Sequence, residues 1–204
     1  HHLDDQIENF YIRLSRGSGL YGLSSMTVNE KNKDNINVLR PFLNLPKEKL
    51  VHVAKKVFKT FVKDPSNVND KFLRSRIRKL KSSLAKEGLD QSRILKTISN
   101  LNTAKDAIDF YVKQSQKKHI HLVNNNKVII DRKLFMSQPM EITYRVMADL
   151  IRKKSKKDYP PRAKGLEHLI ASIQKKNFTK VTLGGFVLSL EKNKIIMSKE
   201  NRNA

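Results

Sequence analysis

The sequence predicts an α/β part followed by a mainly helical α+β part. In residues 1–68, short strand-like segments flank a segment with helical periodicity, which is the βαβ order of an α/β sheet domain. After residue 89, apolar residues recur at helical spacing, and two hairpin-like segments accompany them. We therefore expect the later portion of an α/β domain over 1–68, an arginine-rich linking helix over 69–88, and a helical domain with small hairpins over 89–204.

The first helix is expected to begin near Asp4 and to end at Gly17, because glycine is a common C-terminal stop. Its apolar residues recur at i, i+3, i+4 and i+7, which places them on one helical face. These residues are Ile7, Phe10, Tyr11 and Leu14.

A strand, a helix and a second strand are expected next. Ile36–Leu39 alternates like a strand, Pro46 is placed to open a helix, and residues 61–62 suit a short strand. The helix is expected to turn one face toward the core of the α/β domain. That face consists of Leu50, Val51, Ala54 and Val57.

The linking helix follows a polar turn, Asp64–Asn67, in which Pro65 prevents a continuous helix. Asn69 or Asp70 is expected to cap it, since their side-chain oxygens can accept from free backbone N–H groups. Its buried stripe is expected to consist of Leu73, Ile77, Leu80 and Leu84.

The same helix concentrates positive charge on another face. Arg74 and Arg78 lie one turn apart, with Lys81 nearby. Like charges at this spacing destabilise a free helix by about 0.2–0.5 kcal/mol per pair. An anion bound to this face would offset the cost, whereas the alternative interpretation is a basic face that water solvates.

The second part is expected to contain helices over about 90–116, around 142–151 and around 166–173. One hairpin is expected over 120–130. A second should pair residues 181–190 with 195–197, with Gly184-Gly185 forming a bulge. A dense basic run occupies 152–157. The histidines of this part are not at metal-ligand spacing with an acidic partner, so we expect structural roles for His119, His121 and His168.

The chain has a formal net charge of +23 and an estimated pI of 10.2. This balance favours an anionic partner, most commonly a nucleic acid, although an AT-rich coding sequence would also enrich lysine. There is no cysteine, so disulfides and thiolate-bound zinc are excluded within this stretch. No apolar run reaches the roughly 20 residues of a transmembrane helix, and no signal peptide is recognised. A cytoplasmic location is the default expectation.

The chain begins with two histidines and two carboxylates, His1-His2-Leu3-Asp4-Asp5, at a helix entrance. Carboxylates hold hard cations and a free helix N-terminus favours anions, so one interpretation is a corner that handles Mg²⁺ or phosphate. The other interpretation is simple capping by Asp4 or Asp5. The segment Arg16–Leu23 that follows bends at spaced glycines but lacks the G-x-x-x-x-G-K-[ST] spacing of a P-loop.

Taken together, these motifs resemble the tRNA(Ile)-lysidine synthetases (also called synthases) of the ATP-pyrophosphatase superfamily. The resemblance is strong to about residue 85 and looser beyond. It implies a Rossmann-like sheet domain of the adenine-nucleotide α-hydrolase type. In this family an asparagine usually stands where Ser75 occurs here. The motifs that carry the resemblance are His1–Gln6, Arg16–Leu20, Arg40-Pro41, and Asp64–Asn67 followed by Arg74, Arg76, Ile77 and Arg78.

The resemblance implies a carbon–nitrogen ligase that uses ATP and Mg²⁺ to modify tRNA(Ile). The carbonyl oxygen of the wobble cytidine is adenylated with release of pyrophosphate, and the amine of free lysine then displaces AMP to form lysidine. The family's ATP loop, Ser-Gly-Gly-x-Asp-Ser, precedes the His-His-x-Asp-Asp motif and is absent from this stretch. We therefore expect a later portion of a longer protein, inactive alone, and leave open whether it forms a homodimer.

The resemblance also implies roles for individual residues. His1, Asp4 and Asp5 would be catalytic, His1, Asp5 and Arg16 would contact the nucleotide, and Asp5 would bind the metal. Arginine forks suit phosphate better than lysine does, and lysines position an RNA backbone without reading its sequence. The residues expected to bind tRNA are Asn67, Arg74, Arg76, Arg78, Lys153, Lys154, Lys156 and Lys157.

Two other function classes stay open at this point. One is a relative of the same superfamily that transfers sulfur to a tRNA base. The absence of cysteine disfavours those members that use a cysteine pair in the later half of the protein. The other is a non-catalytic RNA-binding module in which the carboxylates only cap helices.

Overall fold

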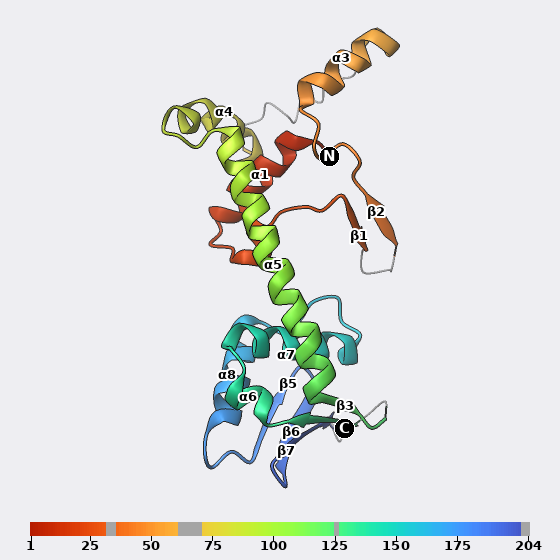
Figure 1. Cartoon of the computed structure of the whole chain (residues 1–204), viewed down its shortest axis with the longest axis vertical. Helices are drawn as coiled ribbons and strands as arrows, with labels where there is room; N and C mark the ends of the chain where they lie inside the picture. The colour runs from red at the N-terminus through yellow and green to blue at the C-terminus, as the bar shows by residue number, and fades with distance from the viewer. Residues whose placement is uncertain (32–35, 61–70, 125–126, 201–204) are drawn as a thin grey trace. The chain divides into compact units, whose positions relative to one another are not determined.

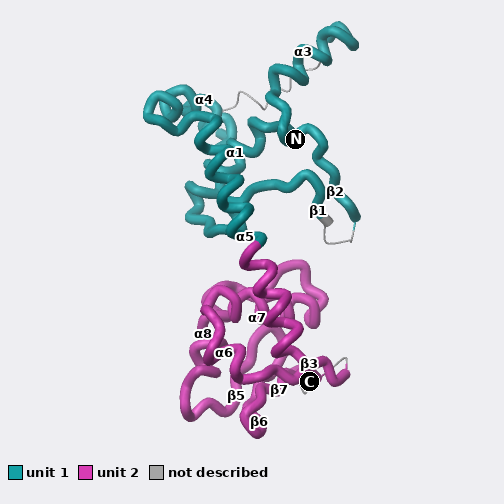
Figure 2. The backbone as a smooth tube through the Cα atoms, in the orientation of Figure 1, with its two compact units in different colours: residues 1–106 teal, residues 107–204 magenta. Residues whose placement is uncertain are grey.

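The computed structural model describes residues 1–31, 36–60, 71–124 and 127–200, and Figure 1 labels its elements. The chain divides into two compact units, His1–Asp106 (unit 1) and Ala107–Ala204 (unit 2), which Figure 2 colours separately. This division differs from the expected boundaries at residues 68 and 88. The physical reason is packing, because the arginine-rich helix and the start of the helix after it share one core with the first helix.

Unit 1 combines helices with one small sheet. The two strands are antiparallel, with Glu30 opposite Val38. The first helix ends at Leu14, three residues before the predicted stop at Gly17, and Gly17 has a φ of 67° in the turn that follows. The elements are α1 (Leu3–Leu14), α2 (Leu20–Leu23), β1 (Asn29–Lys31), β2 (Asn37–Leu39), α3 (Lys47–Phe58), α4 (Leu73–Lys86) and the first part of α5 (Gln91–His119).

The core of unit 1 lies between α1, α4 and α5. Of the stripe expected on α4, Leu73, Ile77 and Leu84 pack into this core, whereas Leu80 is 54% exposed. The Tyr11 hydroxyl donates to the Leu89 carbonyl at 3.1 Å and so ties α1 to the segment between α4 and α5. The buried apolar residues of this cluster are Ile7, Phe10, Tyr11, Ile77, Ile94 and Ile98.

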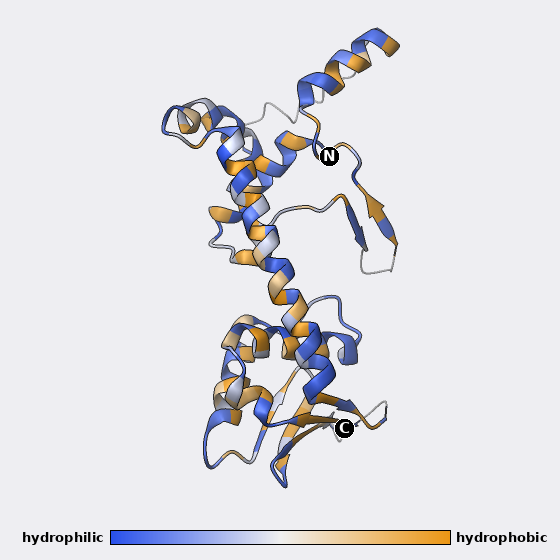
Figure 3. Cartoon of the chain, in the orientation of Figure 1, coloured by the Kyte–Doolittle hydropathy of each residue, from blue (hydrophilic) through white to orange (hydrophobic). Residues whose placement is uncertain are grey.

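The βαβ expectation for residues 36–62 is met only in part. β2 is present, but it pairs with β1 in antiparallel orientation, and the strand expected at 61–62 lies outside the described residues. α3 forms behind Pro46 as predicted, yet none of its residues is buried, and Figure 3 shows apolar segments along it. Of the expected core face, Leu50, Val51 and Ala54 are half-buried and Val57 is exposed, so the described residues cover this face only in part.

The start of α4 also differs from expectation. Phe72 occupies the N-cap position and makes no side-chain cap hydrogen bond. The residues that were expected to cap the helix, Asn69 and Asp70, lie outside the described residues. The N-cap side chain therefore contributes no hydrogen bond to α4, whereas its charged face makes ion pairs with α1.

Unit 2 is an α+β unit built on one five-stranded antiparallel sheet, in the order β3-β4-β7-β6-β5. The helices expected in this half are all present, and the short α6 was not predicted. In addition to the end of α5, the elements are β3 (Ile120–Leu122), β4 (Lys127–Asp131), α6 (Lys133–Ser137), α7 (Met140–Ser155), α8 (Ala163–Gln174), β5 (Lys180–Leu183), β6 (Phe186–Glu191) and β7 (Lys194–Lys199).

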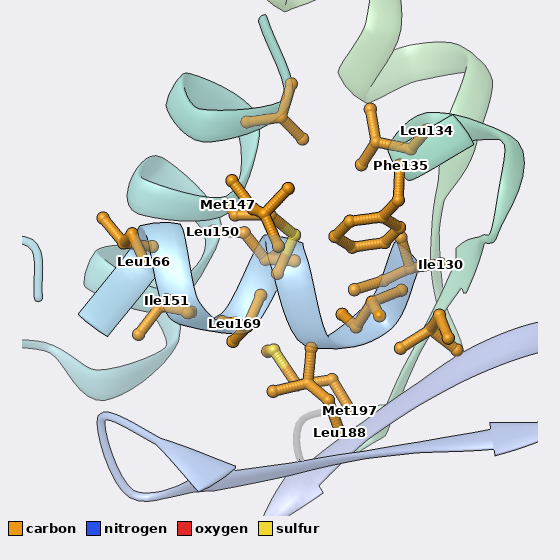
Figure 4. Close-up of a cluster of buried hydrophobic side chains, with 14 of the residues drawn as sticks. Ile130, Leu134, Phe135, Met147, Leu150, Ile151, Leu166, Leu169, Leu188 and Met197 are labelled. Carbon is orange, nitrogen blue, oxygen red and sulfur yellow. The ribbon is translucent and has the colours of Figure 1, made fainter. Parts of the chain in front are cut away.

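One face of this sheet packs against the helices. Alternate residues of β4 are buried, because successive side chains of a strand point to opposite faces. Figure 4 shows Leu188 and Met197 from the sheet directed toward Leu169 of α8, with Phe135 of α6 in the same cluster. Each of these four side chains is at most 1% exposed. None of the helices that the structure describes has the length and apolar content needed to cross a membrane.

The strand predictions for unit 2 were partly correct. The hairpin over 120–130 is confirmed, with Ile120 opposite Ile130. The segment 181–190 was expected to be one strand with a bulge, but it forms two strands that reverse at Gly184-Gly185. Both glycines have positive φ, 65° and 85°, which suits a tight two-residue hairpin turn. Pairing of β4 with β7 then joins the two expected hairpins into one sheet.

The turn at Gly184-Gly185 yields a matched pair of variants. Alanine at either position costs about 1–2 kcal/mol, because L-residues avoid positive φ. At Gly184 the added Cβ would also lie 2.8 Å from Cγ2 of Ile151, whereas at Gly185 it would meet open space. We expect Gly184→Ala to lower the free energy of unfolding by about 1–3 kcal/mol more than Gly185→Ala does. Urea denaturation of both variants measures this, and equal losses would contradict the close approach to Ile151.

Candidate functional site

The first turn of α1 contains the paired carboxylates. α1 begins at Leu3, with His2 at the N-cap position. The Asp5 carboxylate accepts a hydrogen bond from the His2 backbone N–H at 2.9 Å, and the same oxygen lies 3.6 Å from Nε2 of His2. Asp5 is only 9% exposed. One of the two expected carboxylates therefore closes the helix terminus, as the capping interpretation has it.

Asp4 points toward three different groups. Its carboxylate accepts hydrogen bonds from the Lys81 ammonium and, at 3.1 Å, from the Lys47 backbone N–H. Nδ1 of His2 lies 3.8 Å from the same carboxylate. Burial alone would raise the pKa of Asp4, but the bonds from Lys81 and Lys47 and the nearby positive charge outweigh it, so the pKa is lowered. Asp4 is thus an ionised group that links α1 to α3 and α4.

Glu8 lies one turn further along α1 and is 2% exposed. The guanidinium of Arg78, on α4, donates two hydrogen bonds to the Glu8 carboxylate, from Nε to Oε1 at 2.6 Å and from Nη2 to Oε2 at 3.0 Å. Nε of Arg74 lies 3.4 Å from Oε2. The hydrogen bond to Glu8 raises the pKa of Arg78, against the opposing effect of burial. A buried carboxylate is therefore neutralised by two arginines.

These contacts bring the acidic start of α1 onto the basic face of α4. Arg74 and Arg78 contact Glu8, and Lys81 contacts Asp4, so the two helices face each other through these charges. The structure also shows that the anion offsetting the repulsion along α4 is part of the chain itself. Glu8 was missed at the level of sequence, although its spacing of i+4 from Asp4 could have placed it on the same face.

Gln6 is a second residue that sequence reasoning missed. Its side-chain amide donates to the Met26 carbonyl at 2.8 Å, and its carbonyl accepts from the Met26 backbone N–H at 3.0 Å. Ser25, just before, holds a positive φ of 67° and hydrogen-bonds to the same amide oxygen. Gln6 thereby fixes the segment after the glycine-spaced bend against the site.

The other predicted residues are placed differently in unit 1, belong to unit 2, or lie outside the described residues. His1 is exposed. Arg16 lies beyond the C-terminal end of α1, about 15 Å along the helix from the carboxylates of the first turn. Arg76 is exposed and donates to the Lys71 carbonyl at 3.2 Å. Asn67 lies outside the described residues, and the lysines predicted to bind tRNA, residues 153–157, belong to unit 2.

The carboxylates of Asp4 and Asp5 have the donor chemistry that Mg²⁺ prefers. Mg²⁺ is usually held by one or two carboxylates together with substrate phosphates. Among the residues described, no group of three acidic or histidine side chains could hold a metal without other ligands. These residues therefore fit a magnesium ion that nucleotide phosphates help to bind, rather than a site built from this chain alone.

The Glu8–Arg78 pair permits a stability test. Removing one partner of a buried ion pair leaves the other charge uncompensated, which costs about 3 kcal/mol or more. We expect Glu8→Gln and Arg78→Met each to lower the free energy of unfolding by about this amount. The double variant should lose much less than the sum of the two singles.

The control is Arg76→Met, the same chemical change on an exposed residue of the same helix. It should change the free energy of unfolding by about 0.5 kcal/mol or less. Urea denaturation of the four variants completes the cycle. If the double variant loses the full sum, Glu8 and Arg78 act independently and the pair does not join α1 to α4.

Asp4 predicts a pH dependence. Because its pKa is lower in the folded state than in the unfolded chain, its contribution to stability is present above the unfolded value of 3.8. That contribution is lost as the pH falls through the folded pKa. We expect Asp4→Asn to be less stable than the wild type at pH 7, and the difference to vanish toward pH 2. A difference that persists at low pH would show that the charge of Asp4 is not responsible.

Comparisons with known proteins show which families the chain is similar to. Residues 1–84 match the family model of the PP-loop domain. The tRNA(Ile)-lysidine synthase of Orientia tsutsugamushi is 31% identical over 208 residues, which cover 98% of this chain and 46% of that protein. The enzyme of the same name from Rhodopseudomonas palustris is 28% identical over 97% of this chain and 60% of its own length.

A shorter match is more similar. The tRNA(Ile)-lysidine synthase of Rickettsia africae is 46% identical over 78 residues, or 38% of this chain and 16% of that protein. The chain thus spans about half the length of the curated relatives that match nearly all of its own residues. Residues 1–84 match a PP-loop domain, and the chain is similar to the tRNA(Ile)-lysidine synthases over nearly its whole length, which confirms the resemblance seen in its motifs.

Proposed function

We propose that this chain is part of a tRNA(Ile)-lysidine synthetase, an ATP-dependent carbon–nitrogen ligase that acts on the wobble cytidine of tRNA(Ile). In the first step the cytidine carbonyl oxygen attacks the α-phosphorus of ATP and pyrophosphate leaves. In the second, the amine of free lysine attacks the activated ring carbon, AMP leaves with the oxygen, and the amine loses its protons. The product is lysidine.

One observation carries the proposal beyond the sequence similarity. The acidic first turns of α1 and the arginines of α4, far apart in sequence, lie against each other in unit 1. A ligase of this type must hold a nucleotide and an RNA strand at one place. Carboxylates that help to bind Mg²⁺ and guanidinium groups that bind phosphate supply those two capacities side by side.

The contacts in unit 1 support some of the individual roles, and the resemblance implies the others. Asp5 would supply one carboxylate to a Mg²⁺, with His1 and Asp4 as the other predicted residues, and that ion would supply positive charge where pyrophosphate leaves. Arg74 is 45% exposed and reaches RNA, whereas Arg78 is held by Glu8 and positions the face on which Arg74 lies. Arg76 and Asn67 contribute further RNA contacts, and Arg16 contacts the nucleotide from the other end of α1.

The proposal extends to the rest of the protein. Residues 1–68 belong to a Rossmann-like nucleotide domain that needs an ATP loop supplied from elsewhere in the longer protein. The lysines at 153–157 position tRNA by contacting its backbone. The enzyme acts in the cytoplasm. A base-thiolating relative is not favoured, because the named relatives are lysidine synthases along nearly this whole chain.

The experiment is lysine-dependent release of AMP from ATP and tRNA(Ile) by the full-length protein, in the wild type and in Asp5→Asn. Asparagine retains an oxygen that can accept the His2 backbone N–H and removes only the charge. We expect Asp5→Asn to lose turnover by 100-fold or more, while tRNA binding persists and the free energy of unfolding changes by less than about 1 kcal/mol.

Two results would contradict the proposal. Release of AMP that does not depend on lysine would indicate a different nucleophile, as in a thiolating relative. Unchanged turnover in Asp5→Asn would leave Asp5 as a helix cap alone. Lys86→Gln is the matched control, because it removes a charge from the last turn of α4, away from Glu8, and should leave turnover unchanged.

A further inference from the structure

Unit 2 contains a pocket of about 680 Å³, and the function above uses only some of the lysines at its rim and none of its apolar lining. It lies among the C-terminal end of α5, the edge strand β3, the second half of α7 and the last residue of β7. A volume of this size is in the range of pockets that bind small molecules or a single nucleotide. Its lining residues are Gln116, Lys117, Ile120, Leu122, Asp149, Leu150, Lys153, Lys154, Lys156 and Lys199.

The apolar part of the lining comes from the register of the sheet. Leu122 lies opposite Val128, which lies opposite the buried Met197, so Leu122 shares the sheet face that packs against the helices. It is nevertheless 67% exposed, because β3 extends that face beyond the helices that cover the other strands. Ile120, two residues earlier, is on the same face. An apolar floor is therefore open to a ligand at the edge of the core.

The charged part of the lining is almost entirely cationic. The one carboxylate, Asp149, is already neutralised by Lys153 at 2.6 Å and by Arg152 at 2.8 Å, and Gln116 donates to it at 2.9 Å. Burial would raise the pKa of Asp149, but these hydrogen bonds lower it, so it stays ionised and paired. Among the described residues, Lys117, Lys154, Lys156 and Lys199 have no ion-pair partner.

Lys156 occupies an unusual backbone position at the rim. It adopts φ 54° and ψ 25° at the C-terminal cap of α7, where glycine is the common residue. A lysine in this left-handed conformation costs about 1 kcal/mol relative to glycine. Lys156 lines the pocket in this conformation, and strained residues of this kind cluster at binding sites. The simpler explanation, that these lysines only complement the α7 dipole, does not account for the apolar floor.

We propose that this pocket holds one unstacked nucleotide of the bound RNA. The base lies against Ile120, Leu122 and Leu150, and the flanking phosphates contact the four unpaired lysines. Single-stranded RNA is recognised in this way, because unstacked bases can leave the strand and bury their faces while cations follow the backbone. A duplex could contact the lysines but would leave the floor unused. The inference rests on the proposed function insofar as that function requires the chain to bind tRNA.

The test measures binding of two RNAs to the 204-residue chain across a range of KCl concentrations. One is a fluorescently labelled single-stranded octamer of uridine, and the other is a duplex with the same number of phosphates. The variants are Lys154→Gln with Lys156→Gln, and Leu122→Ser. Their matched controls are Lys176→Gln, on an exposed lysine outside the pocket, and Val123→Ser, an exposed apolar neighbour that does not line it.

We expect the double lysine variant to bind the octamer at least tenfold more weakly. Its slope of log K against log salt should fall by about 1.4, since each phosphate neutralised in a single strand contributes about 0.7. Leu122→Ser should weaken octamer binding about fivefold or more and leave both the slope and duplex binding unchanged. The controls should bind like the wild type.

The proposal is overturned if Leu122→Ser binds the octamer as the wild type does. It is also overturned if the double lysine variant weakens duplex and octamer equally, because the lysines would then form a general basic surface. Binding of tRNA(Ile) by Arg74→Gln separates this outcome from the proposed function. If Arg74→Gln weakens tRNA binding and the pocket variants do not, the pocket inference fails and the ligase assignment stands.

Discussion

The packing of unit 1 depends on one carboxylate, Glu8, which is buried in the middle of α1. A buried charge is tolerated only when a partner compensates it, and here Arg78 does so with two hydrogen bonds. Because the partners lie on different helices, this pair sets the position of α4 along α1. It also brings Lys81 to Asp4, one turn away. The arrangement that presents arginines at the site is therefore the same arrangement that holds the core together.

Local patterns were sufficient to predict most helices. The apolar spacing of Ile7, Phe10 and Tyr11 places α1 correctly, and similar spacing places α5, α7 and α8. Contacts between distant residues were not predictable in the same way. Nothing near Glu8 specifies that it meets Arg78, which lies 70 residues later. Likewise, the pattern of α3 predicts an apolar face correctly but does not reveal whether another element covers it.

The basic residues of the chain include some that pair with carboxylates and some that do not. On α4, much of the positive charge is matched by carboxylates of α1 and serves the packing of unit 1. In unit 2, several lysines beside β3 and α7 have no such partner among the described residues. Composition alone does not distinguish these two kinds, because both contribute equally to net charge. The distinction requires knowing which charges face one another, and only unpaired charges attract an anion at full strength.

The order of strands in unit 2 bears on how the protein emerges from the ribosome. β4 pairs with β7, so the sheet cannot close until the residues from Asp131 to Lys194 have all been made. At about 5–20 residues per second, the β3–β4 hairpin waits roughly 3–13 s with one edge open. During that interval its apolar side chains are accessible to other nascent chains. Speed of translation, and chaperones that shield such edges, therefore bear on the yield of this unit more than on that of a unit closed by neighbouring strands.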